Sequence, residues 1–168
     1  MGLACVNWDR VDRDTMAALY RREAARWDAL GWDTATTWPQ VELARQLGTV
    51  DGRLLVDGAS VQGWTFFLLH GSTLQVGALL APSEAGTRLL VDAIFDSDRA
   101  RRANAVTVFA YADAPGADGA LAQHGLHVDH YRYLRRPLGA VDPPQLDGLR
   151  PWRPEDGPAT AELLARAY

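Results

Sequence analysis

The feature of the sequence that most constrains the fold is a series of three apolar segments separated by two tight-turn signals. Residues 53–56, 61–70 and 73–81 are rich in aliphatic, β-branched and aromatic side chains, a composition typical of strands. Asp57-Gly58 and Gly71-Ser72 stand between them, and short turns of this kind join neighbouring antiparallel strands. The sequence therefore predicts an antiparallel sheet in the middle of the chain.

Helical periodicity precedes this sheet. Apolar side chains recur every three or four positions over residues 15–30 and again over residues 37–47, the spacing that gives a helix one apolar face. Asp12 or Asp14 is placed to cap the first helix, and Gly31 follows it where a left-handed residue commonly ends a helix. The first third of the chain is therefore predicted to form two helices.

The pattern after the sheet alternates between helix and strand. Pro82 ends the third strand, and residues 84–103 predict a helix. Residues 105–112 form a β-rich run, a short helix is expected to end near Gly125, and residues 127–135 alternate as a strand does. Antiparallel hairpins followed by one β-α-β crossover predict a mixed α/β fold with helices on both faces of the sheet.

Composition narrows the classes of function. A chain of 168 residues that is 48% hydrophobic can form one packed domain. A net charge of −4 disfavours nucleic acid as a partner, because phosphate binding needs a clustered positive face. The sequence has no lysine, which excludes Schiff-base chemistry, and one cysteine, Cys5, which excludes an internal disulfide. No apolar run reaches the roughly 20 residues that span a bilayer, so we expect a cytoplasmic protein without a membrane partner.

This order of elements resembles the GNAT superfamily of N-acetyltransferases over residues 6–138. Residues 79–90 (LLAPSEAGTRLL) are similar to the family's strand, proline and pyrophosphate loop. Residues 124–126 (HGL) and 131–138 (YRYLRRPL) are similar to its Gly-Phe pair and its closing strand. The resemblance implies a GNAT-like αβα sandwich around a mixed, mostly antiparallel sheet, and transfer of an acyl group from acyl-CoA to a primary amine.

The resemblance also implies acetyl-CoA as the cofactor. The family holds the pyrophosphate with the pattern R/Q-x-x-G-x-G/A at a helix N-terminus, where backbone N–H groups and the helix dipole attract an anion. By loop position, the residues implied to bind the cofactor are Leu80, Ala81, Ala85, Gly86, Thr87 and Arg88. However, Ala85 stands at the Arg/Gln position, Arg88 at the first required glycine and Leu90 at the required Gly/Ala. A register two residues earlier places Glu84 in the loop, so either register predicts a degenerate loop.

The catalytic positions of the family are altered as well. Leu121 stands where many members have the tyrosine that protonates the leaving thiolate, and residues 73–81 contain no carboxylate to act as the base. The remaining candidates are His70 as a base and Tyr111 or Tyr131 as an acid. We therefore predict a GNAT-type protein with weak or no activity alone. The alternative is a non-catalytic module that shapes the acceptor site or the dimer interface of a catalytic partner domain.

Three histidines near the last predicted strand raise the question of a metal site. His124, His127 and His130 stand three residues apart, with Asp129 beside them. Imidazole and carboxylate groups bind zinc, but this set spans a helix end, a glycine and a strand. Because such spacing does not bring the side chains together, we predict no metal site.

The end of the sequence predicts a second structural unit. Residues 1–138 form the GNAT-like domain, and residues 139–148 are rich in proline and glycine, as linkers are. Residues 149–168 are similar to the opening strand and helix of another GNAT domain. We interpret the chain as the N-terminal half of a tandem protein that stops early in its second half; a C-terminal helix packing back on one domain is the alternative. The expected partners are a small-molecule amine acceptor and either a second copy or a C-terminal GNAT domain.

Overall fold

A computed structural model describes residues 2–108, 114–129 and 150–167, and the chain divides into two compact units, 1–129 and 130–168. The predicted linker, 139–148, lies outside the described residues. In chain order the first unit contains β1 (Ala4–Asn7), η1 (Trp8–Arg10), α1 (Arg13–Ala29), α2 (Thr37–Gln46), β2 (Asp51–Asp57), β3 (Ser60–His70), β4 (Thr73–Leu80), α3 (Glu84–Phe95), α4 (Asp98–Arg101), β5 (Ala105–Val108) and α5 (Ala117–Gln123). The second unit contains η2 (Pro154–Asp156) and α6 (Gly157–Ala167).

The described strands form one five-stranded sheet in the order β1-β2-β3-β4-β5. Every neighbouring pair is antiparallel except β4 and β5, which run parallel through the crossover of α3 and α4. Gly58 and Gly71 adopt φ of 60° and 58° in the two hairpin turns, a conformation that favours glycine. The predicted mixed, mostly antiparallel sheet is therefore confirmed.

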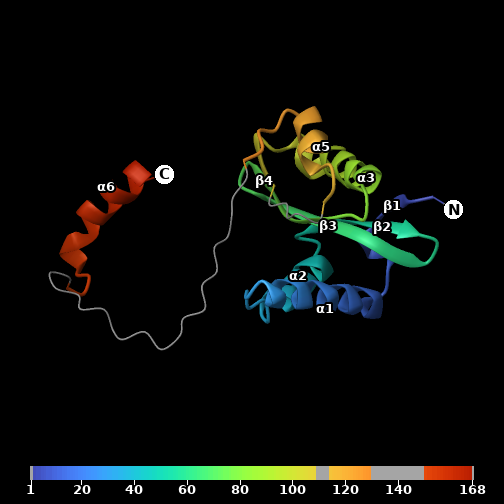
Figure 1. The fold of residues 1–168 in the computed structure, drawn as a ribbon, viewed down its shortest axis with the longest axis horizontal. Helices are drawn as coiled ribbons and strands as arrows, with labels where there is room; N and C mark the ends of the chain where they lie inside the picture. Colours follow the sequence, from blue (N-terminus) through green and yellow to red (C-terminus); the bar gives the residue numbers. More distant parts are fainter. Residues whose placement is uncertain (1, 109–113, 130–149, 168) are drawn as a thin grey trace. The chain divides into compact units, whose positions relative to one another are not determined.

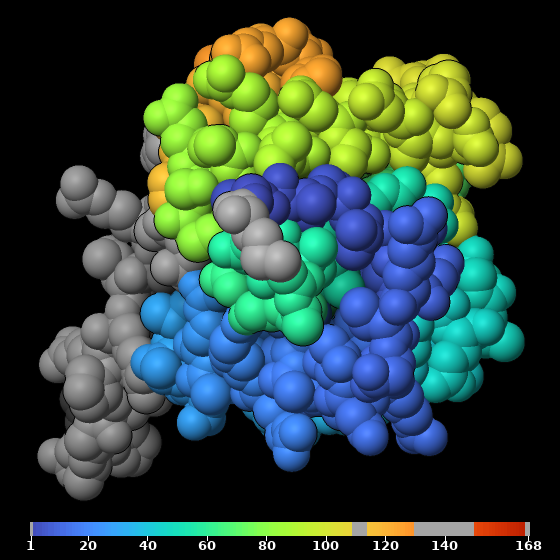
Figure 2. All heavy atoms as spheres, turned by 90° about the vertical axis from the view of Figure 1, so that its right-hand side faces the viewer, coloured from blue at the N-terminus to red at the C-terminus, as the bar shows by residue number. Residues whose placement is uncertain are grey.

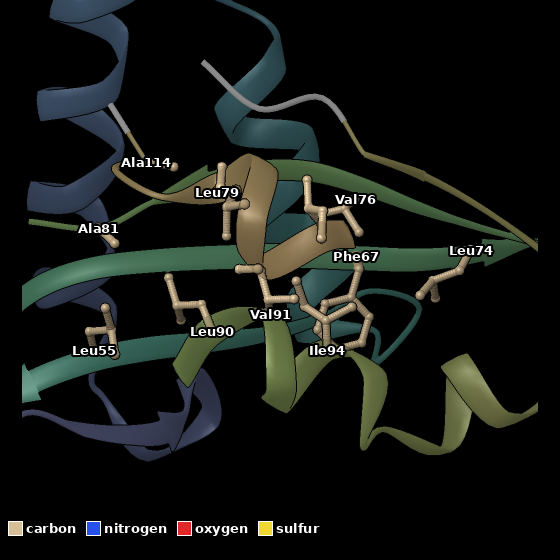
Figure 3. Close-up of a cluster of buried hydrophobic side chains, with 13 residues drawn as sticks. Leu55, Phe67, Leu74, Val76, Leu79, Ala81, Leu90, Val91, Ile94 and Ala114 are labelled. Carbon is tan, nitrogen blue, oxygen red and sulfur yellow. The ribbon is translucent and has the colours of Figure 1, made fainter. Parts of the chain in front are cut away.

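Helices cover both faces of this sheet. The α1 and α2 helices lie on one face and α3 and α5 on the other (Figure 1), and the space-filling view shows the same layers from the side (Figure 2). Because successive strand residues point to opposite faces, Leu54 joins one apolar cluster and Leu55 the other. Figure 3 shows Leu90 and Ile94 of α3 reaching toward the strands on the second face.

The structure confirms the residues predicted to cap the start and the end of the first helix. The Asp12 carboxylate accepts a hydrogen bond from the Thr15 N–H at 2.8 Å, which satisfies one of the free donors of the first turn. At the other end Gly31 has φ of 80°, and its N–H donates to the Asp28 carbonyl at 2.7 Å. The helix is therefore held between a capping acid and a left-handed glycine.

The structure differs from the prediction in three elements. Strand β1 precedes α1 and pairs with β2, from Ala4↔Val56 to Asn7↔Arg53. The predicted helix 84–103 is broken, because the Ser97 hydroxyl donates to the Ile94 carbonyl at 2.6 Å and accepts from the Ala100 N–H, local bonds that compete with helix continuation. Residues 127–129 are not part of a strand; residues 130–135 of that predicted strand, like 109–112 of the preceding one, lie outside the described residues.

A bulge in β4 shifts the register of its last residues against β3. Phe66 pairs with Ala78 but Phe67 pairs with Val76, so Gly77 is the extra residue of the pair. A Cβ on Gly77 would stand 2.3 Å from the Phe66 ring, so a larger residue there would displace that ring. On the other side of β4, pairing with β5 runs to Val76↔Val108 within the described residues. The last residues of β4, Ala78 to Leu80, pair with Phe66 to Trp64 of β3.

The second unit is a short capped helix. Arg150 donates two hydrogen bonds to the Asp156 carboxylate, at 2.7 and 2.6 Å, and the Arg153 N–H donates to the same carboxylate at 2.8 Å. The α6 helix begins at the next residue. None of the described helices is long and apolar enough to cross a membrane.

Candidate functional site

The N-terminus of α3 is capped by the side chain of Ser83. The Ser83 hydroxyl accepts a hydrogen bond from the Gly86 N–H at 3.2 Å. The Ser83 carbonyl accepts from the Thr87 N–H at 2.9 Å and from the Thr87 hydroxyl at 3.2 Å. The Thr87 N–H makes the first regular bond of the helix, and the Gly86 N–H is the donor of the first turn that Ser83 occupies.

A carboxylate stands at this same helix end. Glu84 is the first residue of α3, and its carboxylate lies 3.6 Å from the Arg88 guanidinium one turn later. Its methylene groups lie against Gly116, where a Cβ would stand 2.4 Å from Glu84 Cγ. Gly116 also has φ of 72°, so both space and backbone require glycine there. A negative charge is favourable at a helix N-terminus, and it opposes the binding of an anion.

The glycine of this segment faces the core. Gly86 is buried, and a Cβ on it would stand 3.0 Å from Leu55 Cδ1 and 3.5 Å from Ala81 Cβ. Leu90 is likewise fully buried, and Leu121 of α5 packs in the same cluster. Gly86 thus lets α3 approach the sheet, and Leu121 is a core residue. Neither position presents a group to a ligand.

A cleft lies instead between α1 and the end of β4. Its inner part is lined by Glu23, Arg26, Trp27, Leu30, Ala78, Leu79 and Leu80. Its outer part is more open and is lined by Arg22, Arg26, Gln62, Leu80, Ala81 and Pro82. Arg26 and Leu80 belong to both parts, so we treat them as one feature, the α1–β4 cleft.

Glu23 is a buried carboxylate in this cleft. It is 2% exposed, and the Arg26 guanidinium lies 3.4 Å from it. Burial raises the pKa of the Glu23 carboxyl, and Arg26 and Arg22 act against this rise. The Trp64 indole also opposes the rise, although the described residues give its N–H no hydrogen-bond partner of good geometry. Burial therefore favours the protonated form of Glu23, and the neighbouring arginines favour its charged form.

Sequence reasoning missed Glu23, although a signal was present. Met16, Leu19 and Tyr20 are buried on one stripe of α1, and Glu23 occupies the next position of that stripe. A charged residue where the helical period expects an apolar one indicates a special environment.

The structure separates the predicted site residues. Leu80 and Ala81 line the cleft, whereas His70 is exposed at the other end of the β3–β4 hairpin, where it pairs with Thr73. The length of β4, roughly 20 Å, separates His70 from the cleft. Ala85, Gly86, Thr87 and Arg88 all belong to the first turns of α3. Tyr111 and Tyr131 lie outside the described residues.

The histidines do not converge within the described part of the chain. His124 Nε2 lies 3.0 Å from an Asp92 oxygen, and its ring stacks on Phe95. His127 pairs with Asp129 at 3.2 Å, and both side chains are well exposed. No group of three or more potential metal ligands is present among the described residues, and His130 is not one of them.

Comparison with known proteins identifies the fold. No protein-family model and no curated protein sequence matches the chain. A solved structure of a probable acetyltransferase is similar over 84% of this chain and all of its own length, with a TM-score of 0.52 and 10% identity. The chain has the GNAT-type acetyltransferase fold. An acetyltransferase of Trypanosoma brucei is also similar, over 82% of this chain and all of its own, with a TM-score of 0.48 and 8% identity.

The predicted GNAT resemblance is thus confirmed at the level of the fold. In this GNAT-type fold the α3 N-terminus is the position at which the resemblance places the pyrophosphate loop. In the first turns of this helix the side chains of Glu84, Ala85 and Arg88 are exposed.

Proposed function

We propose that this chain is a GNAT-type acyltransferase domain with a degenerate CoA loop, and that it carries out little or no acyl transfer alone. Its role is to complete the acceptor site or interface of a catalytic partner domain. The observation that supports this most directly is the closed N-terminus of α3, where Ser83 caps Gly86 and Glu84 adds a negative charge.

Pyrophosphate binding needs several free N–H groups and a net attraction for anions. Among the free donors of the first turn of α3, the Gly86 N–H has its acceptor in the Ser83 hydroxyl. Arg88 offers a positive charge, but it lies 3.6 Å from Glu84 and is partly neutralised by it. An incoming pyrophosphate would have to displace a cap and approach a carboxylate, which makes binding weak.

The acid and base of the reaction lack their expected residues here. Leu121 is 4% exposed within the α3-side core and cannot donate a proton. The β4 strand (TLQVGALL) has no carboxylate. Acyl transfer from a thioester needs a neutral amine and a protonated leaving group, so these roles fall to a partner domain in this proposal.

The test is calorimetric titration of the chain with acetyl-CoA. We expect no saturable heat at micromolar concentration for the natural sequence. The variant Glu84→Gln removes the carboxylate with little change of shape and should bind measurably better, by about threefold to tenfold, because one repulsive charge is removed. Glu155→Gln, an exposed carboxylate of the second unit, makes the same charge change away from the loop and should have no effect. A micromolar Kd for the natural sequence would overturn the proposal.

A repeated pattern supports the partner domain. When Asp156 is aligned with Asp12, Trp152 aligns with Trp8 and Leu163 with Leu19. A short 3-10 helix begins at Trp8 in the first copy and two residues after Trp152 in the second, and in both copies an α-helix begins directly after the aspartate. The second unit therefore repeats the local structure that opens the first.

The two copies differ in what covers them. Trp8, Leu19 and Tyr20 are 1%, 4% and 7% exposed against the sheet of the first unit. Their counterparts Trp152, Leu163 and Leu164 are 62%, 68% and 53% exposed. Within its own unit α6 has an apolar face at the positions of a core face and no element to cover it among the described residues, which is what the first layer of a further GNAT-type domain would present. We infer that the sheet of such a domain covers α6.

A further inference from the structure

The inner part of the α1–β4 cleft contains a carboxyl group in a place that admits very little water. We propose that Glu23 controls the packing of α1 by its protonation: when the carboxyl group is neutral, residues 24–29 of α1 pack against the end of β4, and when it is ionised this contact loosens and admits water. The inference depends neither on acyl-CoA binding nor on a partner domain.

The packed arrangement accommodates a charge on Glu23 poorly. The residue is 2% exposed, and the inner part of the cleft has room for about one water molecule. An exposed carboxylate is hydrated by several water molecules, and a buried one must find equivalent donors in the protein or stay unfavourable. The packed arrangement therefore favours the neutral carboxyl group, which needs less hydration.

The groups around Glu23 offset its burial in part. On α1, Arg26 lies 3.4 Å from the carboxylate, a long contact for an ion pair, and Arg22 is exposed. From β3 the Trp64 indole also favours the charged form, and the lining from β4, residues 78–80, has no titratable side chain. Burial is the largest of these effects, and it raises the pKa of the Glu23 carboxyl above its ordinary value of 4.5.

Glu23 also stands where the firmly packed part of α1 ends. The buried residues of this helix all precede residue 24, and residues 24–29 are half-buried or exposed. A segment with few buried contacts opens at a low cost in free energy. Because Arg26 and Trp27 of this segment line the inner cleft, its movement is the direct way to hydrate a charge on Glu23.

The direction of the pH dependence follows from proton linkage. The packed form binds the proton of Glu23 more tightly than the loosened form does, since burial raises the pKa in the packed form. The packed form therefore has its full stability at and below pH 4.5, and it loses stability as the pH rises through the raised pKa. If Arg26 instead held Glu23 as a strong ion pair, the dependence would have the opposite sign.

Hydrogen exchange of the backbone amides of the full chain tests the inference at pH 5 and pH 8, with rates corrected for the intrinsic pH dependence of exchange. We expect the protection of residues 24–29 to be at least about threefold lower at pH 8 than at pH 5. Glu23→Gln is neutral at both pH values and nearly keeps the shape of the side chain, so its protection should be the same at both.

Glu42→Gln is the matched control for the loss of a carboxylate. The pKa of Glu42 is lowered to about 2, so this group is ionised at pH 5 and at pH 8 alike. The variant should therefore keep the pH dependence of the natural sequence in residues 24–29, even where its overall protection is lower.

Arg22→Gln gives a second readout that leaves the buried carboxyl group in place. Arg22 favours the charged form of Glu23, so removing it should move the loosening to higher pH, by roughly 0.3 pH units for an exposed partner. Arg21→Gln, at an exposed residue of the same helix, should leave the loosening where it is in the natural sequence.

Four results would overturn the inference. Two concern the natural sequence: protection of residues 24–29 that is equal at pH 5 and pH 8, or that rises with pH. The third is a folded Glu23→Gln protein that keeps the natural pH dependence. If Glu23→Gln does not fold, Arg22→Gln decides, and the fourth result is a loosening that it does not move. None of these measurements involves acetyl-CoA, so they do not bear on the proposed function.

Discussion

Two glutamates of the helix layer have opposite electrostatic environments. Glu42 of α2 accepts two hydrogen bonds from Arg45, both at 2.9 Å, one from the Gln46 amide at 2.8 Å and one from the Tyr20 hydroxyl at 3.1 Å. These bonds, with Arg45 first, lower the pKa of Glu42 to about 2. Glu23, by contrast, is buried with few partners, and burial raises its pKa. The first carboxylate stabilises the contact between α1 and α2, and the second is buried beside Arg26.

Glu42→Gln should therefore lower stability in a pH-dependent way. A lowered folded-state pKa contributes stability that is present above the ordinary value of about 4.5 and is lost as the pH falls toward 2. We expect the variant to lose about 1 kcal/mol of unfolding free energy at pH 7, since the group is partly screened by water. The difference should shrink between pH 4.5 and pH 2.

Urea unfolding of both proteins at pH 7 and near pH 2, followed by tryptophan fluorescence, measures this difference. Glu162→Gln on exposed α6 is a suitable control, with an expected change within about 0.5 kcal/mol. An equal loss at both pH values would show that packing, and not charge, is responsible.

At the scale of the elements, the approach of β3 to the end of β4 defines the cleft. Trp64 of β3 pairs with Leu80 of β4. The residue before it, Gly63, lies against the backbone at the end of β4. A Cβ on Gly63 would stand 2.3 Å from the Leu80 carbonyl oxygen and 3.1 Å from Ala81 Cα. These neighbours are backbone atoms, which cannot rotate away as a side chain can. The position of Leu80 and Ala81 in the cleft therefore depends on a glycine across the sheet.

Gly63→Ala should lower the unfolding free energy by about 2 kcal/mol or more, because β4 must move to admit a methyl group. The matched control is Gly119→Ala in α5, where nothing lies within 4 Å of the added Cβ. That change should be neutral or stabilising by up to about 1 kcal/mol, since alanine favours a helix. Chemical denaturation compares the two, and a Gly63→Ala protein as stable as the control would contradict the close approach.

At the scale of the whole molecule, the two units differ in how their apolar side chains are used. The first unit has an apolar cluster on each face of its sheet. The described part of the second unit has one helix and exposes its largest apolar side chains, Trp152, Leu163 and Leu164. The repeated pattern makes a direct comparison of equivalent residues informative.

Leu19→Ala should cost about 2–5 kcal/mol of unfolding free energy, because the side chain is 4% exposed in a packed core. The equivalent Leu163→Ala, at a residue 68% exposed, should change it by less than about 0.5 kcal/mol. Both are measured by chemical denaturation of the full chain. If Leu163→Ala costs as much as Leu19→Ala, α6 packs on a core, and the single-domain alternative replaces the partner-domain proposal.

Local patterns were enough to predict the parts of the fold that local chemistry determines. The turns at Gly58 and Gly71 and the end of α1 at Gly31 all need a positive φ, which the sequence marks with glycine. The strand β1 was not predicted as an element of the order, because it has four residues and exists through its pairing with β2. The break after α3 depends on one serine hydroxyl, a signal too small for periodicity to detect.

The candidate site was harder to predict, because it depends on contacts between residues far apart in the sequence. The degeneracy of the α3 loop was readable from Ala85, Arg88 and Leu90, but the sequence did not reveal that Gly86 faces Leu55 in the core. The α1–β4 cleft was not predicted, because burial of Glu23 depends on which strand residues pack opposite α1. Residue type alone does not give that information.

The capped α3 N-terminus has a consequence for how the stability of the domain depends on ligands. A helix end that recruits a phosphate links the folded population to ligand concentration by mass action. In this chain Ser83 provides the acceptors from within. Under the proposed function, acetyl-CoA should therefore not stabilise the folded state of this domain, and its unfolding midpoint should be the same with and without the coenzyme.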